Sequence, residues 1–127
     1  MQNCPKLRMS RQTKDVELLL PFYRDGLGFD VLDRSENVDG MDTVLLGHQN
    51  WPYQFEFRQV RGAEKAPRAP SSEHYRVFCI EQDDQWSKLL ESMFQAGVAQ
   101  VTPPAQYVNG KWPCVAYEDA DGYRVVL

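Results

Sequence analysis

The chain has 127 residues, of which 43% are hydrophobic, and its 14 basic and 18 acidic side chains give a net charge of -4. This length suits one domain with a buried core, while an acidic balance without a basic run argues against a nucleic-acid partner. No apolar stretch approaches the roughly 20 residues that span a bilayer, and the N-terminus lacks the apolar run of a signal peptide. Three widely spaced cysteines are typical of reduced thiols, so we expect a cytoplasmic protein with no membrane partner.

The first predicted elements are a strand and a helix. Residues 5–11 alternate apolar and polar side chains, as a strand does. The helix that follows is capped by Thr13 or Asp15, presents Phe22 and Tyr23 on its apolar face and ends near Gly26. Pro21 lies inside this helix without an amide donor, which predicts a kink or a late helix start.

Three strands are predicted after the helix, at residues 29–35, 41–46 and 53–58. In the third strand, alternation places three aromatic side chains on one face and three polar side chains on the other. The aromatic face consists of Tyr53, Phe55 and Phe57, and the polar face of Gln54, Glu56 and Arg58.

The second half repeats this order after a linker. Residues 61–72 contain two prolines and no apolar period, which predicts the linker. A strand at 74–80, a helix at 83–95 and strands at 98–101, 112–117 and 123–127 follow. We therefore predict an α+β fold of residues 1–127 as a single domain, made of two βαβββ modules at 5–60 and 73–127 joined by linker 61–72.

Three separated motifs resemble one known family. They are Phe-Tyr-Arg-Asp-Gly-Leu-Gly-Phe at 22–29, Tyr-Gln-Phe-Glu-Phe at 53–57, and Glu-Asp-Ala-Asp-Gly-Tyr-Arg-Val-Val-Leu at 118–127. In this order they resemble the vicinal oxygen chelate superfamily, which includes glyoxalase I, bleomycin resistance proteins and extradiol dioxygenases. The resemblance implies a curled mixed sheet around a cleft that holds a small-molecule ligand, and it implies pairing as a homodimer.

The resemblance also implies where a divalent metal would bind. Enzymes of this superfamily hold it with His or Gln on the first strand of each module and Glu on the last. Here these positions read Arg8, Glu56, His74 and Val126. A guanidinium has no free lone pair and valine has no donor, which leaves only Glu56 and His74 as metal ligands. We expect Arg8 either to pair with Glu56 across the cleft or to hold an anionic group of a ligand.

Three functions remain open from the sequence. The first is a ligand-binding protein without a complete metal site, with Arg8, Glu56, His74, Trp112 and Tyr117 against the ligand. The second is a metal-dependent lyase, isomerase or dioxygenase in which Glu56 is the catalytic residue or a metal ligand and His74 is a metal ligand. The third is a module that keeps only the fold. His74 is equally explained as a solvated side chain, and the aromatic residues as cover for sheet ends or a dimer interface.

Overall fold

The computed structural model describes residues 5–108, 110–111 and 113–127. The first half contains β1 (Leu7–Gln12), α1 (Val16–Leu20), the π-helix η1 (Pro21–Gly26), β2 (Asp30–Val38), β3 (Met41–Gly47) and β4 (Tyr53–Val60). The second half contains β5 (Tyr75–Val77), α2 (Asp83–Gln95), β6 (Gln100–Val101), α3 (Ala105–Val108), β7 (Ala116–Glu118) and β8 (Arg124–Val126).

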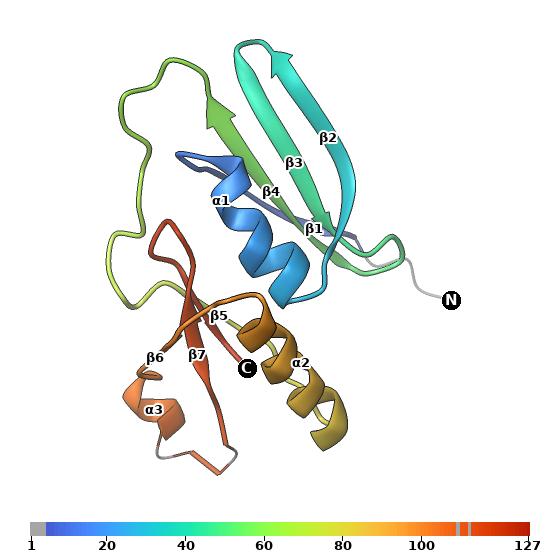
Figure 1. The fold of residues 1–127 in the computed structure, drawn as a ribbon, viewed down its shortest axis with the longest axis vertical. Helices are drawn as coiled ribbons and strands as arrows, with labels where there is room; N and C mark the ends of the chain where they lie inside the picture. The colour runs from blue at the N-terminus through green and yellow to red at the C-terminus, as the bar shows by residue number, and fades with distance from the viewer. Residues whose placement is uncertain (1–4, 109, 112) are drawn as a thin grey trace.

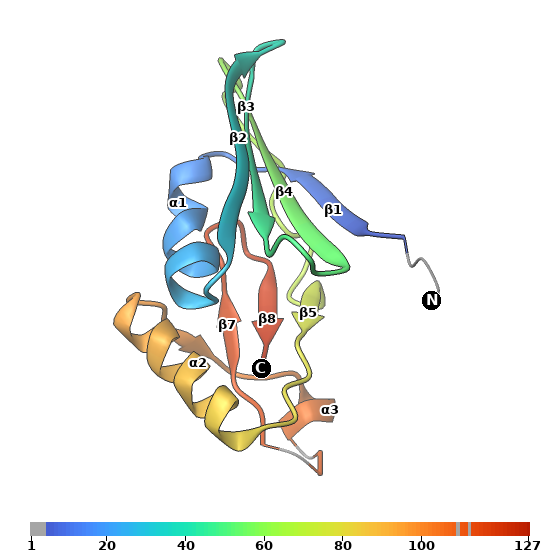
Figure 2. The same cartoon turned by 90° about the vertical axis from the view of Figure 1, so that its right-hand side faces the viewer.

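Each half forms one four-stranded mixed sheet. The strand order is β1-β4-β3-β2 in the first sheet and β5-β8-β7-β6 in the second. In both sheets the first strand of the half pairs in parallel with the last, and the other pairs are antiparallel. Helices α1 and η1 lie across one face of the first sheet, as Figures 1 and 2 show. The predicted α+β fold of two repeated units is confirmed.

The helix of the first half changes its winding at the predicted irregular residue. Asp15 caps α1 by accepting a hydrogen bond from the Glu17 amide. At Pro21 the α-helix passes into the wider turns of η1, which ends with the Leu27 amide donating to the carbonyl of Phe22 at 2.9 Å. A proline cannot donate the bond that an α-helix requires, so the chain widens at this point instead of starting late.

Aromatic and aliphatic side chains from both halves share one core. Phe29 stacks on Phe55 of β4 at 5.5 Å between ring centroids and meets Phe78 of the second half at 6.1 Å. Helices η1 and α2 also approach closely, because a Cβ atom at Gly26 would lie only 2.5 Å from the sulfur of Met93. The glycine of the first motif therefore permits the contact between the two halves.

The second half contains less strand than the sequence predicts. Strand β5 covers 75–77 instead of 74–80, β6 covers 100–101 instead of 98–101, and β7 covers 116–118 instead of 112–117. Alternation marks where side chains permit a strand, but a strand extends only as far as its neighbour can pair with it. Pro113, which lacks an amide donor, lies in the part of the predicted 112–117 strand that does not pair.

The predicted linker contains no described helix or strand. It is held against the turn before β8, where the Ala69 amide donates to the Asp121 carbonyl at 2.9 Å and Arg68 Nη1 donates to the Ala120 carbonyl at 3.0 Å. None of the described helices is long and apolar enough to cross a membrane.

Candidate functional site

Strands β1 and β4 direct polar side chains to one face of the first sheet, and five of these are connected by hydrogen bonds in a set that we call the polar face. In the parallel register of these strands Arg8 is level with Gln54, and Ser10 is level with Glu56. Alternation directs these side chains away from Phe55 and Phe57, which are buried in the core. The polar face consists of Arg8, Ser10, Gln54, Glu56 and Arg58.

The predicted pair of Arg8 and Glu56 is present, with 3.5 Å between Nη1 and Oε2. It runs between neighbouring strands of one sheet, and not across a cleft as expected. Arg8 makes closer contacts with Gln54, whose Oε1 accepts hydrogen bonds from Nε at 3.3 Å and Nη2 at 3.2 Å. Glu56 is held separately, because the Ser10 hydroxyl donates to its Oε1 at 2.6 Å.

Arg8 is the more accessible member of this pair. Its side chain is 52% exposed, whereas that of Glu56 is 21% exposed. Arg58 adds a contact beside Glu56, since its Nε donates to the Ser10 hydroxyl oxygen at 3.2 Å. The polar face thus offers an exposed guanidinium beside a more enclosed, hydrogen-bonded carboxylate.

The second sheet corrects the predicted position of one site residue. Strand β5 places Tyr75 level with Arg124 and Val77 level with Val126. Comparison with the first sheet makes Tyr75 the counterpart of Arg8, and Val126 the counterpart of Glu56. His74 lies one residue earlier and therefore on the opposite face, because a shift of one residue reverses the direction of a strand side chain. It is exposed, and its ring lies 6.3 Å from that of Tyr123.

The corrected positions do not fit a resident divalent metal. Arg8 carries a positive charge, Val126 has no donor, and the Tyr75 hydroxyl accepts a hydrogen bond from Gln106 Nε2. Glu56 is therefore the one carboxylate or imidazole among the four positions. Across the part of the chain that the structure describes, no group of three or more His, Cys, Asp and Glu side chains is placed to hold a metal.

Tyr117, one of the two aromatic residues predicted to touch a ligand, does not line the polar face. Tyr117 is only 1% exposed and belongs to the hydrophobic core, where burial raises its pKa. It was expected at a strand end, and the short β7 instead directs it inward. Trp112 lies outside the described residues.

A buried charged network joins the two halves, and sequence reasoning missed it. Arg11 of β1 reaches the turn before β8, where its Nη2 lies 2.6 Å from Asp119 Oδ2 and its Nη1 lies 2.6 Å from Asp121 Oδ2. The buried Tyr23 hydroxyl of the first motif donates to Asp119 Oδ2 at 2.7 Å. Two motifs quoted for the family resemblance therefore meet in space.

Burial and charge act in opposite directions on this network. Desolvation raises the pKa of Asp119, although Arg11 and the Tyr23 hydroxyl favour its charged form. Desolvation also raises the pKa of Tyr23 well above its ordinary value, and the adjacent Asp119 carboxylate raises it further. Asp119 accepts two more hydrogen bonds, from the amides of Asp121 and Tyr123, so both of its oxygens are satisfied. These bonds connect β1 and the helix of the first half to the turn before β8 in the second.

Comparison with known proteins identifies relatives with the same architecture. Two family models match in succession, the YycE-like N-terminal domain at residues 7–58 and the YycE-like C-terminal domain at residues 73–127. The uncharacterized protein YycE of Bacillus subtilis is 27% identical over 123 residues, which cover 96% of this chain and 86% of that protein. Its crystal structure, described as a candidate glyoxalase/fosfomycin resistance protein of unknown function, matches with a TM-score of 0.82 over 97% of this chain and 88% of that chain.

More distant structures share the fold. Trypanothione-dependent glyoxalase I of Leishmania major is 18% identical, with a TM-score of 0.69 over 100% of this chain and 86% of that chain. The antibiotic binding protein TnmS3 of Streptomyces sp. CB03234 is 20% identical, with a TM-score of 0.62 over 100% of this chain and 96% of that chain. The two family models show that the chain belongs to the YycE-like proteins, and the repeated sheets, the three motifs and these relatives place it in the vicinal oxygen chelate superfamily.

Proposed function

We propose that this protein binds a small organic molecule with an anionic group against the polar face, without a resident metal. The observation that carries this proposal is Arg8, a guanidinium at a position where metal enzymes of the superfamily have a ligand, beside Glu56 at 3.5 Å. A permanent positive charge there repels a metal ion, and its planar donors match a carboxylate or phosphonate.

The charge of the polar face supports an anionic ligand. Its two arginines and one glutamate carry one excess positive charge. Arg8 donates two hydrogen bonds to the neutral amide oxygen of Gln54. A ligand anion can replace this oxygen as acceptor, because a charge-assisted hydrogen bond is stronger than one to a neutral amide. Glu56 does not need to move, because Ser10 already satisfies it.

We further propose that a second copy of the chain completes this site. In a single chain the polar face is open, whereas small-molecule sites usually enclose most of their ligand. Strands β1 and β5 are edge strands of the two described sheets, so each pairs with a neighbour on one side only. Leu7 on β1 and Val77 on β5 have exposed side chains. A homodimer would cover such edges and enclose the ligand. The chain would act as a single domain of two modules, and the free thiols of Cys79 and Cys114 favour a cytoplasmic location.

The descriptions of two relatives supply ligand classes to test. TnmS3 is described as an antibiotic binding protein, and YycE as a candidate glyoxalase/fosfomycin resistance protein. Fosfomycin is a small phosphonate, which makes it a suitable first probe for Arg8. The alternative of a metal-dependent lyase, isomerase or dioxygenase has less support, since Glu56 is the only metal-competent side chain that the four corresponding positions supply.

The test is isothermal titration of fosfomycin and of its neutral dimethyl ester in the presence of EDTA. Loss of a hydrogen-bonded charge pair predicts that Arg8→Gln weakens fosfomycin binding roughly 10- to 100-fold and changes ester binding little. Arg61→Gln is the matched control, because Arg61 is also exposed and paired with a carboxylate, that of Asp42. Equal weakening for both compounds, or fosfomycin binding that requires a metal, would contradict the proposal.

A further inference from the structure

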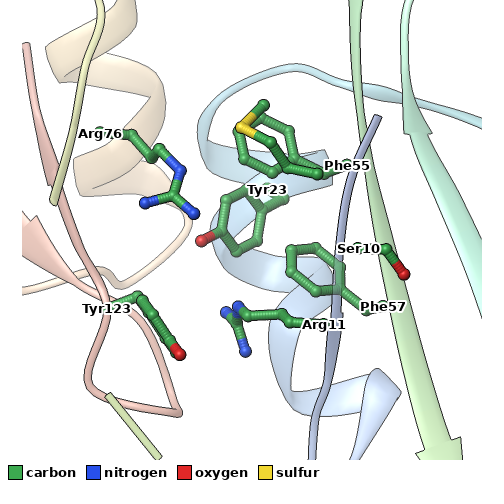
Figure 3. A pocket seen from close by; sticks show the side chains of 8 residues that line it. Ser10, Arg11, Tyr23, Phe55, Phe57, Arg76 and Tyr123 are labelled. Atoms are coloured by element: carbon green, nitrogen blue, oxygen red, sulfur yellow. The ribbon is translucent and has the colours of Figure 1, made fainter. Parts of the chain in front are cut away.

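A cavity of about 220 Å³ lies between the two halves, on the opposite side of β1 from the polar face. Figure 3 shows Arg11, Arg76, Tyr23 and Tyr123 around this cavity, while the Ser10 hydroxyl points away from it. Strand alternation explains this separation, because Ser10 faces Glu56 whereas Arg11 faces the second half. The cavity is therefore distinct from the site proposed above.

Its walls are mainly aromatic. Tyr23, Phe55 and Phe57 line it from the first half, and Tyr123 lines it from the second. These rings belong to a stacked and tilted set, with 4.9 Å between Tyr23 and Phe57 and 6.1 Å between Phe55 and Phe57. Rings held in this way form a rigid apolar surface that suits another planar ring.

One of the two arginines at the cavity is already neutralised. Arg11 donates to both Asp119 and Asp121, and its guanidinium lies 4.7 Å from the centre of the Phe57 ring and 4.1 Å from that of Tyr123. This guanidinium forms part of the wall. It has little capacity left for an additional anion.

The second arginine has no such partner. The side chain of Arg76, on β5, forms no hydrogen bond or ion pair with any residue that the structure describes, although it is half-buried. Figure 3 shows its guanidinium directed into the cavity, beside Tyr23 and Tyr123. A half-buried guanidinium without a partner leaves five donors for a ligand, and a carboxylate can accept two of them at once.

The cavity volume limits the ligand to a small molecule. An apolar cavity of about 150 Å³ accommodates benzene, whereas drug-sized ligands occupy about 300–1,000 Å³. A volume of about 220 Å³ therefore fits one ring with a charged substituent. The cavity is partly open to solvent, so such a ligand can enter without unfolding of the halves.

We propose that this cavity is a second binding site, which takes a small aromatic carboxylate. The ring of the ligand packs against Met9 and Tyr123, above the buried rings of Tyr23, Phe55 and Phe57, and its carboxylate receives hydrogen bonds from Arg76. Arg11 compensates one of the two negative charges of Asp119 and Asp121, and Arg76 supplies a second positive charge at the cavity.

The experiment is isothermal titration of benzoate and of its neutral isostere benzamide into the wild-type protein and Arg76→Gln. Benzoate should bind one site per chain, and Arg76→Gln should weaken it at least tenfold while changing benzamide binding less than twofold. Arg124→Gln is the matched control, because Arg124 lies on the neighbouring strand, on the opposite face, and pairs with Glu118.

Two further variants keep the test decisive if Arg76→Gln does not fold. Arg76→Lys keeps the charge but loses the paired donors, so it should weaken benzoate binding by an intermediate factor. Met9→Phe adds volume to the lining and should abolish binding of both compounds. The proposal is overturned if benzoate shows no saturable binding up to about 10 mM, or if its affinity falls in Arg124→Gln and not in the Arg76 variants.

Discussion

Substitution of Arg11 by methionine tests whether the buried charged network holds the two halves together. The substitution keeps a long apolar stem but removes both ion pairs at 2.6 Å. It leaves the carboxylates of Asp119 and Asp121, whose side chains are 0% and 5% exposed, without their cation. Removing one partner of a buried pair costs about 3–5 kcal/mol, and loss of the ring contacts adds about 0.5–1 kcal/mol.

This loss is large compared with the total stability of a domain, which is about 5–15 kcal/mol. It corresponds to a fall of roughly 10–20 °C in Tm. Urea unfolding followed by circular dichroism measures the change in the free energy of unfolding. Arg124→Met is the control, because the Arg124–Glu118 pair is more exposed and should contribute about 1 kcal/mol or less. A loss below about 1.5 kcal/mol for Arg11→Met, or equal losses for the two variants, would refute this role of the network.

Two other substitutions test the first motif. The pKa of the buried Tyr23 hydroxyl is raised in the folded state, so its contribution to stability is present below pH 10 and is lost as the pH rises through the folded pKa. Tyr23→Phe should therefore flatten the alkaline decline in unfolding free energy, by at most about 1.4 kcal/mol per pH unit, between pH 9 and 11.5 in urea titrations. An unchanged slope would show that Tyr23 ionises normally. Gly26→Ala should destabilise the protein by about 1–3 kcal/mol in thermal unfolding, because the added Cβ meets the buried Met93 sulfur; a gain in stability would contradict the close contact of η1 and α2.

The sequence predicted best those elements whose pattern is periodic and complete. The stripe of apolar residues in α2 predicted a helix over 83–95, and the structure has the same bounds. Alternation in β4 correctly separated Phe55 and Phe57 from the polar Glu56. In both elements a local period fixes which side chains are buried.

The parts that failed depend on contacts between distant segments. Whether His74 or Tyr75 corresponds to Arg8 is decided by the pairing of β5 with β8, which no local pattern of the short β5 encodes. The role of Arg11 depends likewise on Asp119, which is 108 positions away in the chain. An aspartate in a turn is usually exposed to solvent, so the sequence around Asp119 gave no sign that this side chain is buried.

The central claim, that the polar face binds an anionic ligand without a resident metal, is tested most directly at Glu56. The experiment is isothermal titration of Ni²⁺, Zn²⁺ and Mn²⁺ into the metal-free wild-type protein and into Glu56→Gln. Glutamine is a neutral isostere of glutamate, so the comparison isolates the one metal-competent side chain at the four corresponding positions. The account predicts no saturable binding of one metal per chain that depends on Glu56, and fosfomycin affinity that is unchanged by EDTA. Stoichiometric metal binding that disappears in Glu56→Gln would contradict it.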